Sequence, residues 1–142
     1  KIERITLEQP EVISGFMAQF GIHGDPNVNK VWRDANIPDD PVSQSNQKGY
    51  VTFAMSQGRN TRSVQFFINY GDNSFLDSQR FAPIGKVSEG MNVVESLYGG
   101  YGEGQPRGRG PDQFRAQTEG NKYFLASYPN LDYIRSATIV ED

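Results

Sequence analysis

The sequence predicts a mainly β fold in which short strands are joined by many turns. Aromatic residues make up 12% of the chain, with nine Phe and seven Tyr, and such side chains are enriched in strands. The 15 glycines and 8 prolines interrupt the chain often enough to keep most elements short. At 142 residues the chain can bury one hydrophobic core unaided, so we expect a single domain over residues 1–142.

The first half of the chain contains two predicted strands and two loops. Residues 12–20 (VISGFMAQF) are apolar and begin with β-branched residues, which indicates a buried strand, and the GIHGDPNVN stretch that follows favours a loop. Residues 36–48 lack periodicity and are rich in Pro, Asp, Ser and Asn, which predicts a surface loop. Residues 50–55 place their side chains alternately on two faces, so we expect a second strand there.

Residues 64–70 (VQFFINY) form a further predicted strand whose two faces differ in character. Gln65, Phe67 and Asn69 share one face, whereas the alternate residues of this segment are all apolar or aromatic. A polar amide inside an apolar strand is costly unless it has a partner. The face that mixes two amides with a large aromatic ring therefore fits the wall of a binding pocket better than a hydrophobic core.

The second half begins with a predicted strand at residues 81–87 and a helix near residues 90–97. Apolar residues recur at helical spacing in SEGMNVVESLY, Ser88 is suited to the N-cap, and a pair of glycines ends the helix. The run GGYGEGQPRGRGPDQ is so rich in glycine that we expect an exposed loop that does not pack. Residues 122–128 (KYFLASY) and 134–140 (IRSATIV) are the predicted final strands.

Charge and composition argue against several classes of function. The formal net charge of −3 gives no positive field for phosphate backbones or anionic lipid, so we expect neither a nucleic-acid nor a membrane partner. No apolar run approaches the roughly 18 residues that span a bilayer, and KIERITLEQPE lacks the apolar region of a secretory signal. We therefore expect a soluble monomer. Its compartment stays open between the cytoplasm and, after signal removal, an extracytoplasmic space.

Three motifs that imitate functional sites are interpreted as structural. The glycine-rich run fails as a dinucleotide fingerprint because Arg107 stands where a glycine is required. The run DPNVN that begins at Asp25 imitates a calcium-binding loop, but Lys30 replaces its turn glycine. His23 is the only histidine in a chain without cysteine, so we expect no zinc site.

Four segments resemble the cyclophilin-type peptidyl-prolyl cis-trans isomerases, and they occur in the order of that family. These segments are GFMAQFG, NQKGYVTFAMSQGRNTRSVQFFIN, FLDSQRFAPIGKV and EGMNVVESL. The resemblance covers most of the chain from Val12 onward. It implies a cyclophilin-like antiparallel β-barrel capped by the helix near residues 90–97. It also implies isomerisation of Xaa-Pro bonds in proline-containing polypeptides, which assists protein folding, with no cofactor.

The resemblance also implies which residues form the site. Rotation about an Xaa-Pro bond faces a barrier of about 18 to 20 kcal/mol from amide resonance, so a catalyst needs an apolar seat and hydrogen-bonding groups rather than an acid or a base. The catalytic pocket would consist of Phe16, Met17, Gln19, Phe67 and Leu76. The adjoining substrate-binding groove would consist of Met55, Ser56, Gln57, Gln65, Phe75 and Arg80. Taken singly, the apolar members could equally be ordinary core residues.

The sequence departs from the family's pattern at the site itself. Glu11 stands where the family has a catalytic arginine, so the charge is reversed there. We therefore expect weak isomerase activity unless Arg4 or Arg80 reaches the pocket. Phe75 and Arg80 occupy the positions of a family tryptophan and histidine. The alternative function is a catalytically weak module that binds proline peptides.

The N-terminal segment is the other departure. In the family, about two strands, a helix and a further strand precede GFM, and residues 1–11 resemble none of them. We therefore expect an incomplete barrel with exposed strand edges, unless KIERITL supplies a replacement strand. The chain would then be a fragment, an alternative start or a mistaken gene model, and a fragment that does not fold stably is a third hypothesis.

Overall fold

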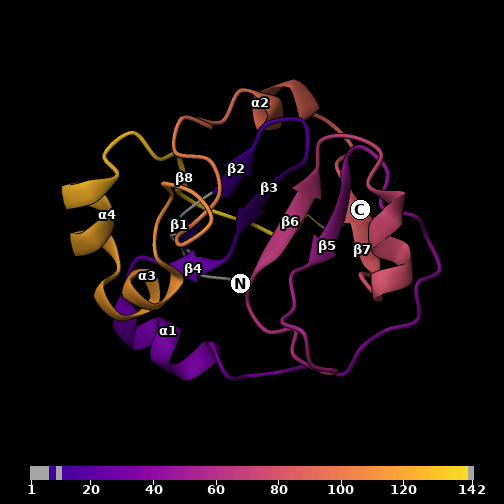
Figure 1. The fold of residues 1–142 in the computed structure, drawn as a ribbon, viewed down its shortest axis with the longest axis horizontal. Coiled ribbons are helices and arrows are strands. Elements are labelled where there is room, and N and C mark those ends of the chain that lie inside the picture. Colours follow the sequence, from indigo (N-terminus) through magenta and orange to yellow (C-terminus); the bar gives the residue numbers. More distant parts are fainter. Residues whose placement is uncertain (1–6, 9–10, 141–142) are drawn as a thin grey trace.

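The computed structural model describes residues 7–8 and 11–140. Most of KIERITL, the predicted replacement strand, lies outside these residues. Figure 1 shows the larger sheet on one side of the molecule and the helices α1, α3 and α4 gathered on the other. The smaller strands β1 and β4 lie between them in this view.

The larger sheet contains, within the described residues, five antiparallel strands in the order β2-β3-β6-β5-β7. The outer strands β2 and β7 each have one partner strand among these residues, so the sheet is open and a closed barrel is not formed. The mainly β character of the prediction is retained. The strands are β2 (Glu11–Ile13), β3 (Met17–Phe20), β5 (Tyr50–Phe53), β6 (Phe66–Asn69) and β7 (Pro83–Lys86).

The segment predicted as one strand at residues 12–20 is a hairpin of β2 and β3. Gly15 adopts φ +72° in the turn, a conformation that side chains disfavour, and the amide of Phe16 donates to the carbonyl of Ile13 at 2.9 Å. Strand β3 then pairs with β6, and Gln19 lies opposite Phe67. This register places two of the predicted site residues side by side.

A second, three-stranded sheet has the order β4-β1-β8 within the described part of the chain. Its strands are β1 (Leu7–Glu8), β4 (Ile22–His23) and β8 (Tyr133–Ile134). Helix α1 (Pro26–Trp32) follows β4, although this stretch was expected to be a loop. Asp25 accepts a hydrogen bond from the amide of Asn27 at 2.8 Å, so the calcium-like run contains the N-cap of a helix.

The prediction of strands near the C-terminus was wrong. The KYFLASY segment belongs to helix α4 (Asn121–Ser127), which follows helix α3 (Gln113–Glu119) after Gly120. Aromatic residues have a high strand propensity, but tertiary packing outweighs it here. Tyr123 and Phe124 are both buried against other helical residues in a hydrophobic cluster. Of the predicted strand at 134–140 the structure retains only the short β8, and the described residues 135–140 have no regular structure.

The described residues contain two hydrophobic clusters. The helical cluster consists of Ile22, Ala116, Tyr123, Phe124 and Tyr128. The sheet cluster is built on Val12, Ala18 and Phe20, with partly buried residues of β6 packed against it. The predicted helix near residues 90–97 is present as α2 (Met91–Glu95), which buries none of its side chains. The 3₁₀ helix η1 (Ser74–Gln79) lies beside the larger sheet and buries Leu76.

Candidate functional site

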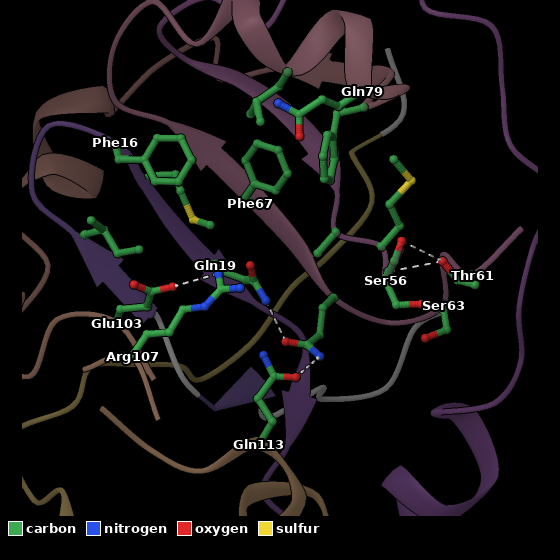
Figure 2. A pocket seen from close by; sticks show the side chains of 17 residues that line it. Phe16, Gln19, Ser56, Thr61, Ser63, Phe67, Gln79, Glu103, Arg107 and Gln113 are labelled. Atoms are coloured by element: carbon green, nitrogen blue, oxygen red, sulfur yellow. Dashed lines mark hydrogen bonds and ion pairs between the residues drawn. The ribbon is translucent and has the colours of Figure 1, made fainter. Parts of the chain in front are cut away.

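A cavity of about 470 Å³ lies over strands β2, β3 and β6 of the larger sheet, beside the turn that follows β5. Helix η1 and the loop at residues 99–112 complete its wall. Figure 2 shows Phe16 and Phe67 on one side of this cavity, the pair Glu103 and Arg107 on another, and Ser56 with Thr61 on a third. We refer to it as the main cavity.

The main cavity has an apolar floor made from four of the predicted residues. Phe67 is 2% exposed and Leu76 is 6% exposed, and Phe16 and Met17 line the cavity beside them. Phe81, which was not among the predicted site residues, also lines the cavity and packs edge-on against Phe67 with ring centroids 5.8 Å apart. An apolar floor of this kind suits a small ring without polar edges, because burial of apolar surface is favourable.

A row of side-chain amides crosses the main cavity next to this floor. Gln19 Nε2 donates to Gln65 Oε1 at 2.8 Å, and Gln65 Nε2 lies 3.4 Å from Gln113 Oε1. Gln19 comes from β3, Gln65 precedes β6 and Gln113 begins α3, so three separate segments meet here. Amides both donate and accept hydrogen bonds, so this row can hold a peptide backbone.

The groove wall combines hydroxyl groups with a thioether. Met55 and Ser56, two of the predicted groove residues, line the main cavity, and Thr61 and Ser63 also line it. The amide of Ser56 donates to Thr61 Oγ1 at 3.1 Å, and Thr61 Oγ1 in turn donates to the carbonyl of Gly58 at 3.1 Å. These bonds hold the turn that follows β5 in one shape.

The remaining predicted groove residues lie outside the lining of the main cavity. Phe75 stacks on Phe16 with ring centroids 6.0 Å apart and is 55% exposed. Arg80 Nη1 pairs with Asp39 Oδ2 at 3.1 Å, and its Nη2 lies 3.5 Å from the carbonyl of Gln57. Among the described residues Arg80 therefore does not extend into the cavity. Arg4, the other arginine considered as a replacement, lies outside the described residues.

The glycine-rich run contributes to the site, although it was expected to be an exposed loop that does not pack. Glu103 and Arg107 line the main cavity, and Arg107 Nη1 pairs with Glu103 Oε1 at 3.5 Å. A Cβ atom at Gly108 or Gly110 would collide with the backbone of Glu103, so these glycines permit a compact turn. Frequent glycine therefore marks close backbone packing here, and no periodic pattern in the sequence reveals it.

A buried network of asparagine side chains holds the backbone next to the apolar floor. Asn73 Nδ2 donates to the carbonyl of Phe16 and to Asn69 Oδ1, both at 2.8 Å, and Asn69 Nδ2 donates to the carbonyl of Tyr50 at 3.0 Å. Asn46, from the predicted surface loop, is 0% exposed and completes the network. Such fully paired amides fix backbone positions, because breaking one bond leaves a buried polar group unsatisfied.

Asp77 connects this network to helix η1. Its carboxylate accepts hydrogen bonds from Ser45 Oγ at 2.5 Å and from the amide and side chain of Asn46 at 3.0 and 2.7 Å. Burial raises the pKa of Asp77, but the hydrogen bonds from Ser45 and Asn46 outweigh this effect and hold the pKa below its ordinary value of 3.8. The carboxylate is therefore the form that fits this site.

The described residues hold neither a cluster of metal ligands nor a helix that could cross a membrane. Within residues 7–8 and 11–140, no group of three or more His, Cys, Asp or Glu side chains is placed to hold a metal ion. None of the helices in the described part of the chain is both long enough and apolar enough to cross a membrane.

Comparisons with known proteins agree on one family. Residues 9–113 match the family model for cyclophilin type peptidyl-prolyl cis-trans isomerase/CLD. The chain is 33% identical over 90 residues to peptidyl-prolyl cis-trans isomerase A of Dickeya dadantii, which covers 61% of this chain and 47% of that protein. It is 35% identical over 101 residues to peptidyl-prolyl cis-trans isomerase CYP21-1 of Arabidopsis thaliana, covering 68% and 44%. Human peptidyl-prolyl cis-trans isomerase-like 3 is 34% identical over 93 residues, covering 60% and 53%. The chain thus spans about half the length of these curated relatives.

Proposed function

The chain belongs to the cyclophilin type peptidyl-prolyl cis-trans isomerase family, and we propose that it binds Xaa-Pro segments of polypeptides and speeds rotation about the Xaa-Pro bond. Such an activity would assist protein folding. The observation that most supports the proposal is the row formed by Gln19 and Gln65 beside the apolar floor around Phe67. This combination matches a substrate with an apolar ring and a polar backbone.

The proposed roles follow from the chemistry of the proline peptide. The pyrrolidine ring has no polar edge and no N–H group, so it would sit on the floor, which consists of Phe16, Met17, Phe67 and Leu76. Gln19 and Gln65 would hold the flanking backbone, since amides offer both a donor and an acceptor. Rotation breaks no covalent bond, so the catalyst has to stabilise a twisted amide rather than transfer a proton.

The residues of the groove would contact the polypeptide on either side of the proline. Met55 and Ser56 line the main cavity and would lie against the bound chain. We place Gln57, Phe75 and Arg80 at the outer end of this groove, where they would meet residues further from the proline. Contacts there would affect which polypeptides bind rather than how fast the bond rotates.

Glu11 is the residue that we expect to lower the rate of isomerisation. Its backbone lies opposite Gln19 in the β2–β3 pair, so the position borders the amide row. A carboxylate cannot donate a hydrogen bond, and loss of one preorganised donor typically lowers a rate by about 10² to 10³. We therefore expect turnover well below that of a protein with arginine at this position.

Isomerisation of a short Xaa-Pro peptide, followed by exchange NMR, tests the proposal directly. We expect the unmodified chain to accelerate exchange measurably, and Glu11→Arg to accelerate it further, by up to about 10²-fold. Glu89→Arg is the matched control, because it makes the same charge change at an exposed residue outside the main cavity. A cooperative thermal transition in each protein establishes that all three are folded.

The outcomes separate the candidate functions. Binding of the peptide without acceleration by the unmodified chain, together with acceleration by Glu11→Arg, would make the protein a binding module. A folded chain that neither binds the Xaa-Pro peptide in an NMR titration nor accelerates its exchange would refute the proposed function. The same peptide with alanine in place of proline serves as the negative control for binding.

A further inference from the structure

We propose that Arg107 supplies the guanidinium that promotes rotation of the Xaa-Pro bond in the main cavity, which makes it a catalytic residue. This inference rests on the proposed function. Arg107 lies in the glycine-rich loop, far along the chain from the strands that form the cavity floor.

The chemistry of the twisted amide calls for a cation or a strong donor near the prolyl nitrogen. In the planar amide the nitrogen lone pair is delocalised onto the carbonyl oxygen, and in the twisted form it returns to the nitrogen. A donor directed at the nitrogen therefore stabilises the twisted form more than the planar one. A donor directed at the oxygen would do the opposite, so the group has to approach from the side of the nitrogen.

Arg107 is the only cationic side chain among the described residues that line the main cavity. The other charged member of that lining is its partner Glu103. Two other arginines of the described chain are paired outside the lining of this cavity. Arg80 pairs with Asp39 at 3.1 Å, and Arg62, which is 3% exposed, pairs with Asp40 at 3.0 Å.

The loop that presents Arg107 is held in place by hydrogen bonds rather than loosely exposed. The amides of Arg107 and Gly108 donate to the carbonyl of Gly104 at 3.1 and 3.0 Å. The amide of Gly110 donates to the carbonyl of Glu103 at 2.8 Å. Tyr128 Oη donates to the carbonyl of Gly110 at 3.1 Å, which ties the loop to the helical cluster. A fixed backbone lowers the entropy cost of placing the side chain against a substrate.

The guanidinium itself remains available to a bound peptide. Its pair with Glu103 spans 3.5 Å at the surface, where ion pairs contribute little, and the Arg107 side chain is 80% exposed. Arg107 also borders a second cavity of about 310 Å³, lined in part by Gln105 and Phe114. A polypeptide that continues from the main cavity toward this second one would cover Arg107 and exclude water from it, which strengthens its interaction with the prolyl nitrogen of the twisted amide.

Kinetics of three loop variants test the role of Arg107. We compare Arg107→Gln and Arg107→Lys with Arg109→Gln, a matched control two residues away that lines neither cavity. Removal of a buried donor lowers rates by about 10² to 10³, and the exposure of Arg107 reduces this, so we expect kcat to fall roughly 10- to 100-fold in Arg107→Gln. Arg107→Lys should retain part of the rate, and Arg109→Gln should match the unmodified chain.

A separate readout distinguishes catalysis from binding or loop structure. The dissociation constant of the Xaa-Pro peptide and the thermal midpoint should be unchanged in Arg107→Gln, while kcat falls. Equal kcat in Arg107→Gln and the unmodified chain would overturn the inference and leave the proposed function intact. An effect confined to the dissociation constant or to thermal stability would overturn it as well. Absence of any acceleration by the unmodified chain would refute the proposed function first, and this inference with it.

Discussion

At the scale of single residues, Asp77 is the clearest case of a charge that the fold uses for stability. Its carboxylate accepts hydrogen bonds from Ser45 and from Asn46, and Asn46 is fully buried. Asn46 Nδ2 also donates to the carbonyl of Phe81, a residue of the cavity wall, at 2.8 Å. The ionisation of Asp77 is therefore coupled to the shape of the main cavity.

Lowering the pH should remove this contribution. Because the folded-state pKa of Asp77 lies below its ordinary value of 3.8, the carboxylate stabilises the fold above that value and the stabilisation is lost as the pH falls through the folded pKa. We expect Asp77→Asn to lower the free energy of unfolding by about 1 to 2 kcal/mol at neutral pH. The difference between the two proteins should shrink below about pH 4. Thermal unfolding of both, measured across pH, checks this, and a constant difference would contradict it.

Residue-level patterns predicted part of the lining of the main cavity and missed the rest for a physical reason. The alternation in VQFFINY correctly separates Gln65 and Phe67 from the opposite face, because a strand has a period of two wherever it lies. Glu103, Arg107 and Gln113 reach the cavity through the path of a long loop. That path depends on contacts with Tyr128 and Tyr123 that no local pattern encodes.

At the scale of elements, helix α2 depends on a few polar contacts. It buries none of its own side chains, yet Tyr70 Oη at the end of β6 donates to the carbonyl of Val94 at 2.6 Å, and Lys48 Nζ lies 2.5 Å from Glu95 Oε1. Burial, with Glu95 and Asp132 nearby, raises the pKa of Tyr70 to about 12. The phenol thus stays protonated and able to donate at any ordinary pH.

Removing the Tyr70 hydroxyl should loosen α2 without disturbing the pocket. Tyr70→Phe deletes one hydrogen bond, worth about 1 kcal/mol, and keeps the ring. We expect faster amide hydrogen exchange in α2 and unchanged exchange in β3 and β6. Tyr50→Phe is the control, because it removes a tyrosine hydroxyl from β5, the strand next to β6 in the same sheet. Equal protection of α2 in Tyr70→Phe and the unmodified chain would show that packing, not this bond, holds the helix.

Element types were predicted best where a periodic pattern and the burial of one face agree. Strands β5, β6 and β7 and helix α2 occur where the sequence predicts them, each shorter by two or three residues. The strand prediction for KYFLASY was wrong because it relied on the strand propensity of the aromatic residues. In the structure Tyr123, Phe124 and Tyr128 are buried together in the helical cluster, and the first two belong to helix α4. Asp112, which accepts from the amide of Arg115 at 2.8 Å, is the N-cap that could have indicated the helical pair.

At the scale of the whole molecule, the two sheets combine strands that are distant in sequence. Strand β1 pairs with β4 and with β8, so both halves of the chain meet in the smaller sheet. The mainly β class was predictable from composition, but the open order of the larger sheet was not, because pairing is decided by long-range contacts. Within the described residues the open sheet leaves β2 and β7 as its outer strands, and such strand edges are where another chain can pair.

Both outer strands have features that discourage pairing with another chain. Strand β2 has three residues, and β7 begins with Pro83 and pairs with β5 through a register shift between Val51 and Thr52. Short strands, proline and irregular pairing are the devices by which proteins protect sheet edges. The charged Lys86 at the end of β7 acts in the same direction.

We therefore expect a monomer, with self-association appearing when an edge is made regular. Sedimentation equilibrium over a wide range of concentrations should give the mass of one chain for the unmodified protein. Pro83→Val restores a backbone donor and a strand-forming side chain to β7, so its average mass should rise with concentration. Ile84→Val, a conservative change in the same strand, should remain monomeric. A dimer of the unmodified protein at low concentration would show that these edges are not protected, and a monomeric Pro83→Val would show that the proline is not what protects β7.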